Sequence, residues 1–185
     1  MQSERERMLA GEPYLATDPE LVAARLRARR LLHAYNASAP DEGERRRALL
    51  AELFGRLDGR IEIEPPFFCD YGSNIEAGDN LYMNFGCVVL DCAPVIFGAN
   101  VMLGPAVQIY AATHPLEPEL RRTGRELAAP VRIGDDVWIG GGAIICPGVS
   151  IGAGTTIAAG SVVIRDIAPR VVAAGNPCRV LREIG

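Results

Sequence analysis

The chain has 185 residues and a formal net charge of −4 at pH 7, which is the length of one domain or of one domain with a short appendage. Hydrophobic residues make up 49% of it and charged residues 23%, a composition that excludes a disordered chain. The mild negative charge argues against a nucleic-acid-binding protein. No apolar run approaches the roughly 18 residues that cross a membrane, and the charged N-terminal segment lacks the apolar stretch of a secretory signal. We therefore expect a cytoplasmic protein without a membrane partner.

Cysteine, lysine and histidine each limit the available chemistry. The five cysteines form an odd set without a CxxC pair, at positions 69, 87, 92, 146 and 178, which disfavours a disulfide framework or a zinc site. We interpret them as small, reduced core residues. Lysine is absent, which excludes a lysine Schiff base, and the two histidines are His33 and His114.

The first part of the chain, residues 1–60, is predicted to be helical. Thr17 and Asp18 supply a polar cap and Pro19 begins the helix. Apolar residues follow at helical spacing, at positions 21, 24, 28, 31, 32 and 35. A second helix is expected from Asp41, which resembles the cap of a capping box, to a closing glycine at position 55.

A six-residue repeat begins at about residue 61. Its clearest stretch places a β-branched aliphatic residue at six consecutive sixth positions: Ile133, Ile139, Ile145, Ile151, Ile157 and Val163. The frame also holds in Phe97, Leu103 and Ile109. Two interruptions occur: the spacing from Val89 to Phe97 is eight residues, and residues 113–130 break the pattern. Neither a helix nor a single strand has this period, but a short strand plus a turn does. Three such units close one triangular coil, and stacked coils bury their inner residues.

The repeat therefore predicts an all-β fold, a parallel β-helix over residues 61–185, with an ordinary β-sandwich as the alternative. The frame is preserved on both sides of residues 113–130. This segment should consequently project outward as a polar excursion with no core of its own to build. A long excursion from a repeat scaffold is more often functional than structural, with a disordered loop as the alternative.

A resemblance to the maltose and galactoside O-acetyltransferases, a family of hexapeptide-repeat acyltransferases, covers almost the whole chain. It is carried by the segments MLAGEPY, RLRARRLLHAYN, CDYGSNI, NFGCVVLD, ATHPL, VWIGGGAIICPGVSIG and AAGNPCRVLREI. The resemblance implies a left-handed β-helix with a short N-terminal helical segment. It also implies acetyl-CoA as donor substrate, a sugar acceptor, no metal, and a homotrimer with active sites between neighbouring β-helices.

Two residues are expected to carry the reaction. His114 stands in ATHP, where the resemblance implies the general base, and an imidazole with a pKa near 6.5 suits proton transfer at neutral pH. Asn84 matches a second catalytic position, where an amide can donate to a developing oxyanion or fix the acceptor hydroxyl. Without the resemblance, Asn84 would be interpreted as a turn residue. His33 is expected only to pack or to face solvent.

The resemblance also implies two sets of binding residues. Asp70, Tyr82 and Arg25 match acceptor-side positions. The expected coenzyme A residues are Trp138, Gly141, Ala159 and Gly160 along the pantetheine arm, and Arg165, Arg179 and Arg182 at the phosphates. Galactoside-type relatives carry an acidic residue in place of Cys92 and of Ala16, and a serine in place of Asp70. These departures leave the identity of the acceptor open.

The sequence thus predicts an acetyl-CoA-dependent O-acetyltransferase that acts directly on a mono- or disaccharide of the maltose, glucose or galactoside type. Two alternatives stay open: an acetyltransferase for another hydroxyl acceptor, such as serine or an antibiotic, and a non-catalytic β-helical scaffold. A β-helical carbonic anhydrase needs three histidine ligands on zinc, and the repeat region holds only His114.

Overall fold

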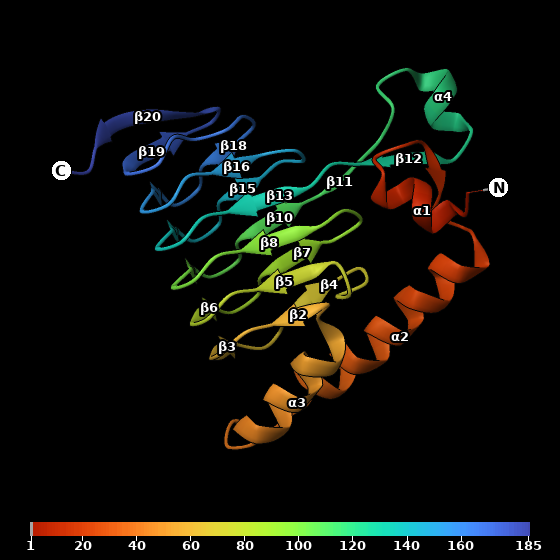
Figure 1. Ribbon diagram of the computed structural model, residues 1–185, viewed down its shortest axis with the longest axis horizontal. Coiled ribbons are helices and arrows are strands. Elements are labelled where there is room, and N and C mark those ends of the chain that lie inside the picture. Colours follow the sequence, from red (N-terminus) through yellow and green to blue (C-terminus); the bar gives the residue numbers. More distant parts are fainter. Residues whose placement is uncertain (1) are drawn as a thin grey trace.

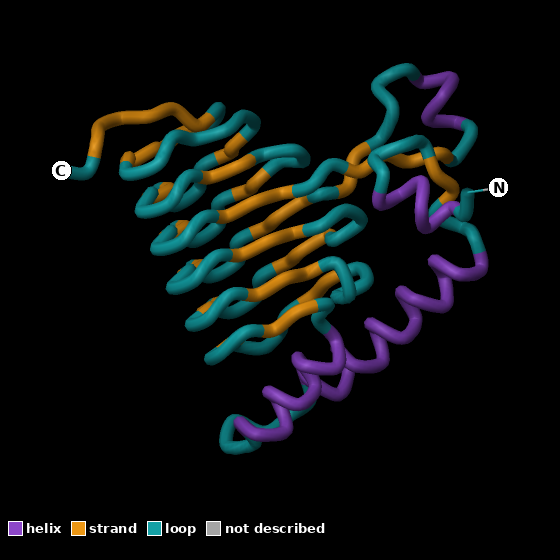
Figure 2. The backbone as a smooth tube through the Cα atoms, viewed as in Figure 1, coloured by secondary structure: helices purple, strands orange, loops and turns teal. Residues whose placement is uncertain are grey.

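The computed structural model describes residues 2–185 and shows an N-terminal helical arm beside a tapering stack of coils (Figure 1). The arm consists of α1 (Glu4–Leu9), the short strand β1 (Tyr14–Leu15), α2 (Pro19–Asn36) and α3 (Gly43–Leu53). The stack consists of short strands joined by tight corners (Figure 2). The first sheet strand, β2 (Arg56–Leu57), precedes residue 61, and the domain boundary at residue 60 stays a prediction.

Three sheets form the sides of the stack. The first sheet contains, in spatial order, β2, β5 (Ile75–Ala77), β8 (Val95–Phe97), β13 (Val131–Ile133) and β16 (Ser150–Ile151). The second contains β3 (Ile61–Ile63), β6 (Leu81–Met83), β9 (Met102–Leu103), β14 (Trp138–Ile139), β17 (Thr156–Ile157), β19 (Val171–Gly175) and β20 (Cys178–Glu183). The third contains β4 (Phe68–Cys69), β7 (Val88–Leu90), β10 (Gln108–Tyr110), β15 (Ile144–Ile145) and β18 (Val162–Val163).

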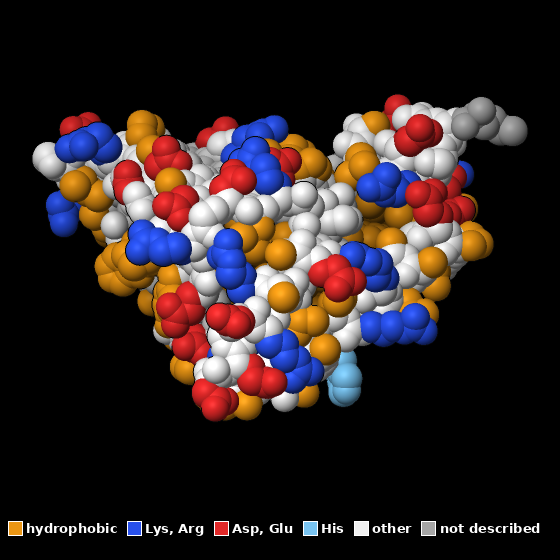
Figure 3. All heavy atoms as spheres, turned by 60° about the horizontal axis from the view of Figure 1, so that its bottom comes forward, with side chains coloured by type: hydrophobic (Ala, Val, Ile, Leu, Met, Phe, Trp, Pro, Cys, Tyr) orange, Lys and Arg blue, Asp and Glu red, His pale blue; other side chains and the backbone are white. Residues whose placement is uncertain are grey.

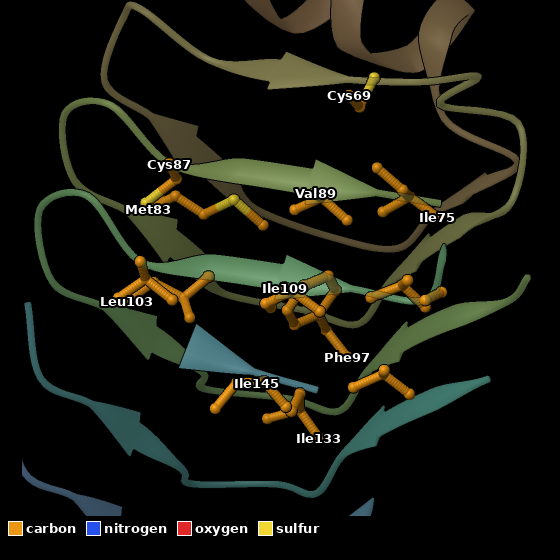
Figure 4. Packing of buried hydrophobic residues seen from close by; sticks show 14 of the residues in the cluster. Cys69, Ile75, Met83, Cys87, Val89, Phe97, Leu103, Ile109, Ile133 and Ile145 are labelled. Carbon is orange, nitrogen blue, oxygen red and sulfur yellow. The ribbon is translucent and has the colours of Figure 1, made fainter. Parts of the chain in front are cut away.

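The register of these sheets explains the six-residue repeat. Ile133 pairs with Ile151 and Ile145 pairs with Val163, so each coil uses three repeats. All pairs within the stack are parallel except β19 with the C-terminal β20, which runs back antiparallel. The inward side chains are fully buried and stack on one another along the axis (Figure 4). The parallel β-helix predicted from the repeat is confirmed.

The helical arm covers the first coil. Asp18 caps α2 by accepting a hydrogen bond from the N–H of Glu20 at 2.9 Å, as the sequence predicts. At the other end of α2, the side chain of Asn36 both accepts from the N–H and donates to the carbonyl of Phe67. The hydroxyl of Tyr35 donates to the carbonyl of Ile63. These contacts give the open end of the β-helix the polar cover that terminal repeats require.

The prediction for the start and end of α3 is wrong in detail. Glu42, not Asp41, stands at the N-cap, and its carboxylate accepts from the N–H of Ala39 in the preceding turn, at 2.8 Å. At the C-terminus, Phe54 leaves the helix in an extended conformation. Gly55 serves close packing instead, because a Cβ atom there would lie 2.2 Å from the carbonyl oxygen of Ser73.

The excursion differs from the predicted outward loop. It contains β11 (Ala112–Thr113), α4 (Pro118–Arg122) and β12 (Arg125–Ala128). β12 pairs with β11 and, on its other side, with β1 of the helical arm, which forms a three-stranded antiparallel sheet. Ala128 and Tyr14 are buried there. The expectation that the excursion builds no core is therefore wrong for its second half, whereas α4 buries no side chain.

The remaining features concern the surface and the cysteines. All five cysteines are free, and Cys146 is the one that is not fully buried. Charged side chains of both signs share the surface with scattered apolar ones (Figure 3). Within residues 2–185, no helix has the length and apolar character needed to cross a membrane, and no cluster of His, Cys, Asp and Glu side chains is suited to hold a metal ion.

Candidate active site

A pocket of about 330 Å³ lies between α2, the corners that follow β4 and β7, and β12 of the excursion. We call it the corner pocket. It is lined by Ala16, Thr17, Arg25, Arg29, Asp70, Tyr71, Cys92 and Glu126. The fold thus brings together two of the three residues predicted to bind the acceptor, Arg25 and Asp70.

Arg25 is held in the corner pocket by two hydrogen bonds. Its guanidinium donates to the hydroxyl of Tyr71 at 2.7 Å and to the backbone carbonyl of Ala16 at 2.6 Å. The guanidinium carbon also lies 5.6 Å from the centre of the Tyr71 ring, within cation–π range. These contacts turn one arginine of α2 toward the β-helix, while Arg29 remains exposed at the pocket rim.

Asp70 presents a carboxylate to the same pocket. The thiol of Cys92 donates to it at 3.4 Å. Burial raises the pKa of Asp70, the Cys92 thiol and Arg25 act in the opposite direction, and Glu126 adds to the rise. A partly buried carboxylate facing a guanidinium is well suited to accept and orient hydroxyl groups of a ligand.

His114 follows the first strand of the excursion and is exposed. The residue before it, Thr113, pairs with Leu127, the chain neighbour of Glu126. Glu126 in turn accepts a hydrogen bond of 3.0 Å from the hydroxyl of Tyr14. The hairpin that carries His114 is thereby tied to the wall of the corner pocket through Glu126, although His114 itself does not line the pocket.

The other predicted catalytic residue, Asn84, lies at a different corner. Asn84 follows β6, and its side-chain carbonyl accepts from the N–H of Phe85 at 2.7 Å, so its amide NH₂ is the group that can donate to a ligand. The same corner in later coils is built from the predicted small residues Gly141, Ala159 and Gly160. The N–H of Gly160 donates to the carbonyl of Gly141 at 2.9 Å.

This column of small residues is open at Gly160, whereas at Gly141 a Cβ atom would lie 3.0 Å from the carbonyl oxygen of Pro105. A Cβ atom built on Gly160 would meet no atom within 4 Å, so a ligand can approach the backbone there. The outer face of the second sheet adjoins the column. Along this face Trp138 pairs with Thr156, Thr156 with Val172 and Val172 with Arg182. Trp138 and Arg182 are exposed, and the two residues between them are half-buried. Tyr82 stands lower on the same face, two ladder positions from Trp138.

The predicted arginines divide between two places. Arg179 and Arg182 lie on β20, and their guanidinium groups contact only backbone carbonyls, those of Cys178 and Glu183. Neither forms an ion pair with a carboxylate in the part of the chain that the structure describes, so both charges are available to an anion. Arg165 follows β18 and lies at the far end of the third sheet instead.

The predicted residues therefore form two groups in one chain. Strands of the third sheet begin near Asn84, which precedes β7, and end near Asp70, which follows β4. One group gathers where they begin and on the adjoining face: Tyr82, Asn84, Trp138, Gly141, Ala159, Gly160, Arg179 and Arg182. Arg25, Asp70 and His114 lie along the edge where they end, and Arg165 lies on the same edge beyond β18, at the opposite end of the sheet from Asp70. A single chain does not bring His114 and Asn84 together.

Comparison with known proteins agrees with this fold. The family model described as the maltose acetyltransferase hexapeptide capping motif matches residues 7–59, and the bacterial transferase hexapeptide model matches residues 130–165. A putative acetyltransferase of Saccharomyces cerevisiae is 52% identical over 97% of this chain and 92% of its own length. The crystal structure of a maltose O-acetyltransferase from Clostridium difficile 630 is 48% identical, with a TM-score of 0.97 over 99% of this chain and 98% of that one.

A galactoside acetyltransferase in complex with coenzyme A is also similar, at 42% identity and a TM-score of 0.96, over 100% of this chain and 92% of that one. The stack is accordingly a left-handed β-helix of hexapeptide repeats, the fold of an acyltransferase class. Within that class, the chain belongs to the maltose and galactoside O-acetyltransferase family.

Several pocket residues were not predicted as site residues. Tyr71 and Glu126 line the corner pocket, and Tyr14 positions Glu126. Tyr71 and Tyr14 lie in the segments CDYGSNI and MLAGEPY, but no role was predicted for either, and Glu126 lies outside the segments that carry the resemblance. The sequence contained one indication of the corners that form this pocket. The spacing of eight from Val89 to Phe97 marks a widened corner, and the coil below it is widened in the same way, since Ala77 pairs with Phe97 and Cys69 with Val89.

Proposed function

We propose that the chain transfers an acetyl group from acetyl-CoA to a hydroxyl of a mono- or disaccharide, of the maltose, glucose or galactoside type. The observation that supports this most is the corner pocket, where Asp70 and Arg25 lie beside the hairpin of His114. A carboxylate and a guanidinium can fix neighbouring hydroxyl groups, and an imidazole can accept the proton of one of them. The relatives named after maltose and galactoside favour the same class of acceptor.

The reaction needs no covalent enzyme intermediate, because the thioester is already activated. In the proposed step, His114 accepts the proton of the acceptor hydroxyl while the hydroxyl oxygen bonds to the acetyl carbonyl carbon. The resulting oxyanion accepts hydrogen bonds, and the Asn84 amide is the proposed donor. The C–S bond then breaks, the oxyanion returns to a carbonyl, and the thiolate of coenzyme A leaves with the proton that His114 holds.

The donor is proposed to lie along the column of small residues. Gly141, Ala159 and Gly160 let the pantetheine arm lie against the backbone, and the exposed Trp138 flanks it. The arginines 165, 179 and 182 are proposed to bind the coenzyme phosphates, because a guanidinium fork matches phosphate oxygens.

We propose a homotrimer, since one chain splits the site into two groups. The outer ladder of the third sheet is mostly apolar and offers a surface for a second copy: Phe68, Val88, Gln108, Ile144 and Val162. At the tip of the excursion, Leu116 is 85% exposed and Leu120 53% exposed, which suits contact with a neighbour. In a ring of three copies, the His114 group of one chain would face the Asn84 group of the next. Five free thiols fit the reducing cytoplasm that we propose as its location.

Acceptor profiling tests this function. The purified protein would be supplied with acetyl-CoA and a panel of maltose, glucose, galactosides, serine and chloramphenicol, and acetylated products would be identified by mass spectrometry. We expect O-acetylated sugar. Turnover confined to serine or chloramphenicol would overturn the sugar assignment, and no acetyl transfer to any hydroxyl would favour a non-catalytic scaffold.

A further inference from the structure

A buried aspartate holds the widened corner that carries Asp70 and Tyr71. Asp91 lies in the next coil, directly above this corner, and is fully buried. Its Oδ1 atom accepts hydrogen bonds from the N–H groups of Asp70, at 3.1 Å, and Tyr71, at 2.8 Å. Its Oδ2 atom accepts from the N–H of Asn74 at 3.2 Å. One carboxylate therefore binds both ends of the corner formed by residues 70–74.

The contact is reciprocal. The side-chain amide of Asn74 donates to the backbone carbonyl of Asp91 at 2.7 Å, so each corner fixes the other. The residue after Asp91 is Cys92, whose thiol donates to the Asp70 carboxylate. Asp91 thus holds the backbone of Asp70, while its chain neighbour contacts the Asp70 side chain.

Burying a carboxylate to hold this corner carries a free-energy penalty. Asp91 has no ion-pair partner in residues 2–185, and burial raises its pKa to about 7 even though its N–H donors favour the charged form. Elsewhere the same chain holds its corners with neutral hydroxyls. Thr155, equally buried, accepts from the N–H of Val171 and donates to the carbonyl of Ala168 at a corner far from the pocket.

The effect of Asp91 extends to the helical arm. The backbone of Tyr71 is bound by Asp91, and the Tyr71 hydroxyl accepts from Arg25, which in turn donates to Ala16. A chain of hydrogen bonds therefore leads from Asp91 to two of the three residues predicted to bind the acceptor, Asp70 and Arg25. A neutral side chain that accepts only one bond could hold one end of the corner but not both.

We propose that Asp91 is a positioning residue of the acceptor site, which fixes residues 70–74 so that Asp70, Tyr71 and Arg25 face the acceptor together. This inference rests on the proposed function of the corner pocket. Asp91 itself does not line the pocket, so it acts through the residues that it orients.

The test compares Asp91→Asn with Asp70→Ala and with Thr155→Val as the matched buried control. Asparagine retains one acceptor oxygen but points an NH₂ group at N–H donors. We expect Asp91→Asn to raise the acceptor KM about 10- to 100-fold, the range for a misplaced binding group, and to leave the acetyl-CoA KM within about twofold. Amide hydrogen exchange of residues 70, 71 and 74 should accelerate. Thr155→Val should change neither KM, although it lowers the melting temperature.

Each outcome has a separate meaning. If Asp70→Ala raises the acceptor KM but Asp91→Asn, still folded, does not, Asp91 is only structural and the inference is overturned. If neither variant changes the acceptor KM while exchange of residues 70–74 accelerates, the corner pocket is not the acceptor site and the proposed function is at fault. If Asp91→Asn does not fold, Asn74→Ala loosens the same corner from its other side, and an unchanged acceptor KM there overturns the inference.

Discussion

The hydroxyl of Tyr14 donates a hydrogen bond of 3.0 Å to the carboxylate of Glu126, across the antiparallel pair of β1 and β12. This contact joins the helical arm to the excursion over a sequence separation of 112 residues. Burial is the main cause that raises the pKa of Tyr14, so the phenol stays protonated and donates at neutral pH. The corner pocket therefore depends on two segments that meet only in the folded chain.

Two truncations of the excursion should separate its structural and functional parts. Replacing residues 117–124 with a short Gly-Ser link should lower the melting temperature only modestly, because α4 buries no side chain. Replacing residues 117–128 also removes β12 and the partner of Tyr14, and should lower it much further. With the shorter cut, acceptor turnover should nearly vanish while acetyl-CoA still binds.

Circular dichroism, coenzyme titration and turnover on the same samples check this prediction. Full turnover after the shorter cut would show that the tip of the excursion does not enclose the acceptor. Equal melting temperatures for the two cuts would show that β12 does not support the arm.

Mixed trimers should test whether the site lies between copies. His114→Ala and Asn84→Ala chains, each with its own affinity tag, would be co-expressed and the mixed trimers purified over both tags. Each variant alone should be nearly inactive. In a closed ring, one site of each mixed trimer keeps both residues, so turnover should return to about one third of the wild-type value. Mixed trimers as inactive as their parents would place both residues in one chain's site.

The arginines of β20 should govern coenzyme affinity. Arg179→Ala or Arg182→Ala should raise the KM for acetyl-CoA more than it alters kcat, because phosphate contacts are equal in the ground and transition states. Both side chains are exposed, so each contact should contribute about 1 kcal/mol, or roughly a fivefold change in KM. Arg30→Ala, an exposed arginine of α2, is the matched control. A second control uses a coenzyme that lacks the 3′-phosphate. If the KM of each variant exceeds that of wild type by the same factor with this coenzyme, these arginines do not bind the 3′-phosphate.

The pH dependence of stability should carry a contribution from Asp91. Its pKa is raised from 3.8 to about 7 in the folded chain, so between these values the folded state holds a proton that the unfolded chain releases. The free energy of unfolding should therefore fall as pH rises through this window, by up to about 1.4 kcal/mol per pH unit. The other titratable groups facing Asp91 are the Asp70 carboxyl and the thiols of Cys69 and Cys92. Burial raises the pKa of both thiols, so the thiols stay neutral.

Urea unfolding of wild type, Asp91→Asn and Thr155→Val checks this contribution. Measurements from about pH 4 to about pH 8 span both the ordinary and the raised pKa of Asp91. Asp91→Asn should lose part of the slope and Thr155→Val should retain it. Parallel curves for all three proteins would mean that Asp91 ionises as it does in the unfolded chain.

The β-helix could be predicted because its signal is repeated. Each coil requires an inward aliphatic residue at the same position, as Ile133 and Ile151 show in successive coils. The pattern therefore recurs often enough to be recognised. The helix start at Asp18 was predictable because cap and proline are adjacent in sequence. The cap of α3 was not, because the Glu42 carboxylate accepts from the N–H of Ala39 behind it and from the side chain of Arg45, and not from a backbone N–H of the helix.

The corner pocket could be predicted only in part. The resemblance identified Arg25 and Asp70, but nothing in the sequence shows that Glu126 joins them. That placement depends on the pairing of β1, a strand of two residues that is too short to give an alternating pattern. The role of Asp91 was likewise hidden: Asp91 ends the segment NFGCVVLD, but that segment does not show that its carboxylate binds backbone N–H groups of the corner at residues 70–74.

Turnover of a sugar acceptor by His114→Ala, with His33→Ala as control, tests the central claim most directly. Both histidines are exposed, but His33 lies on α2 and His114 on the hairpin beside the corner pocket. If His114 is the general base, kcat with acetyl-CoA and the sugar should fall by about 10²–10⁴ in His114→Ala. Coenzyme binding should be unchanged, and His33→Ala should match wild type. A His114→Ala protein that retains near wild-type kcat would contradict the proposed mechanism.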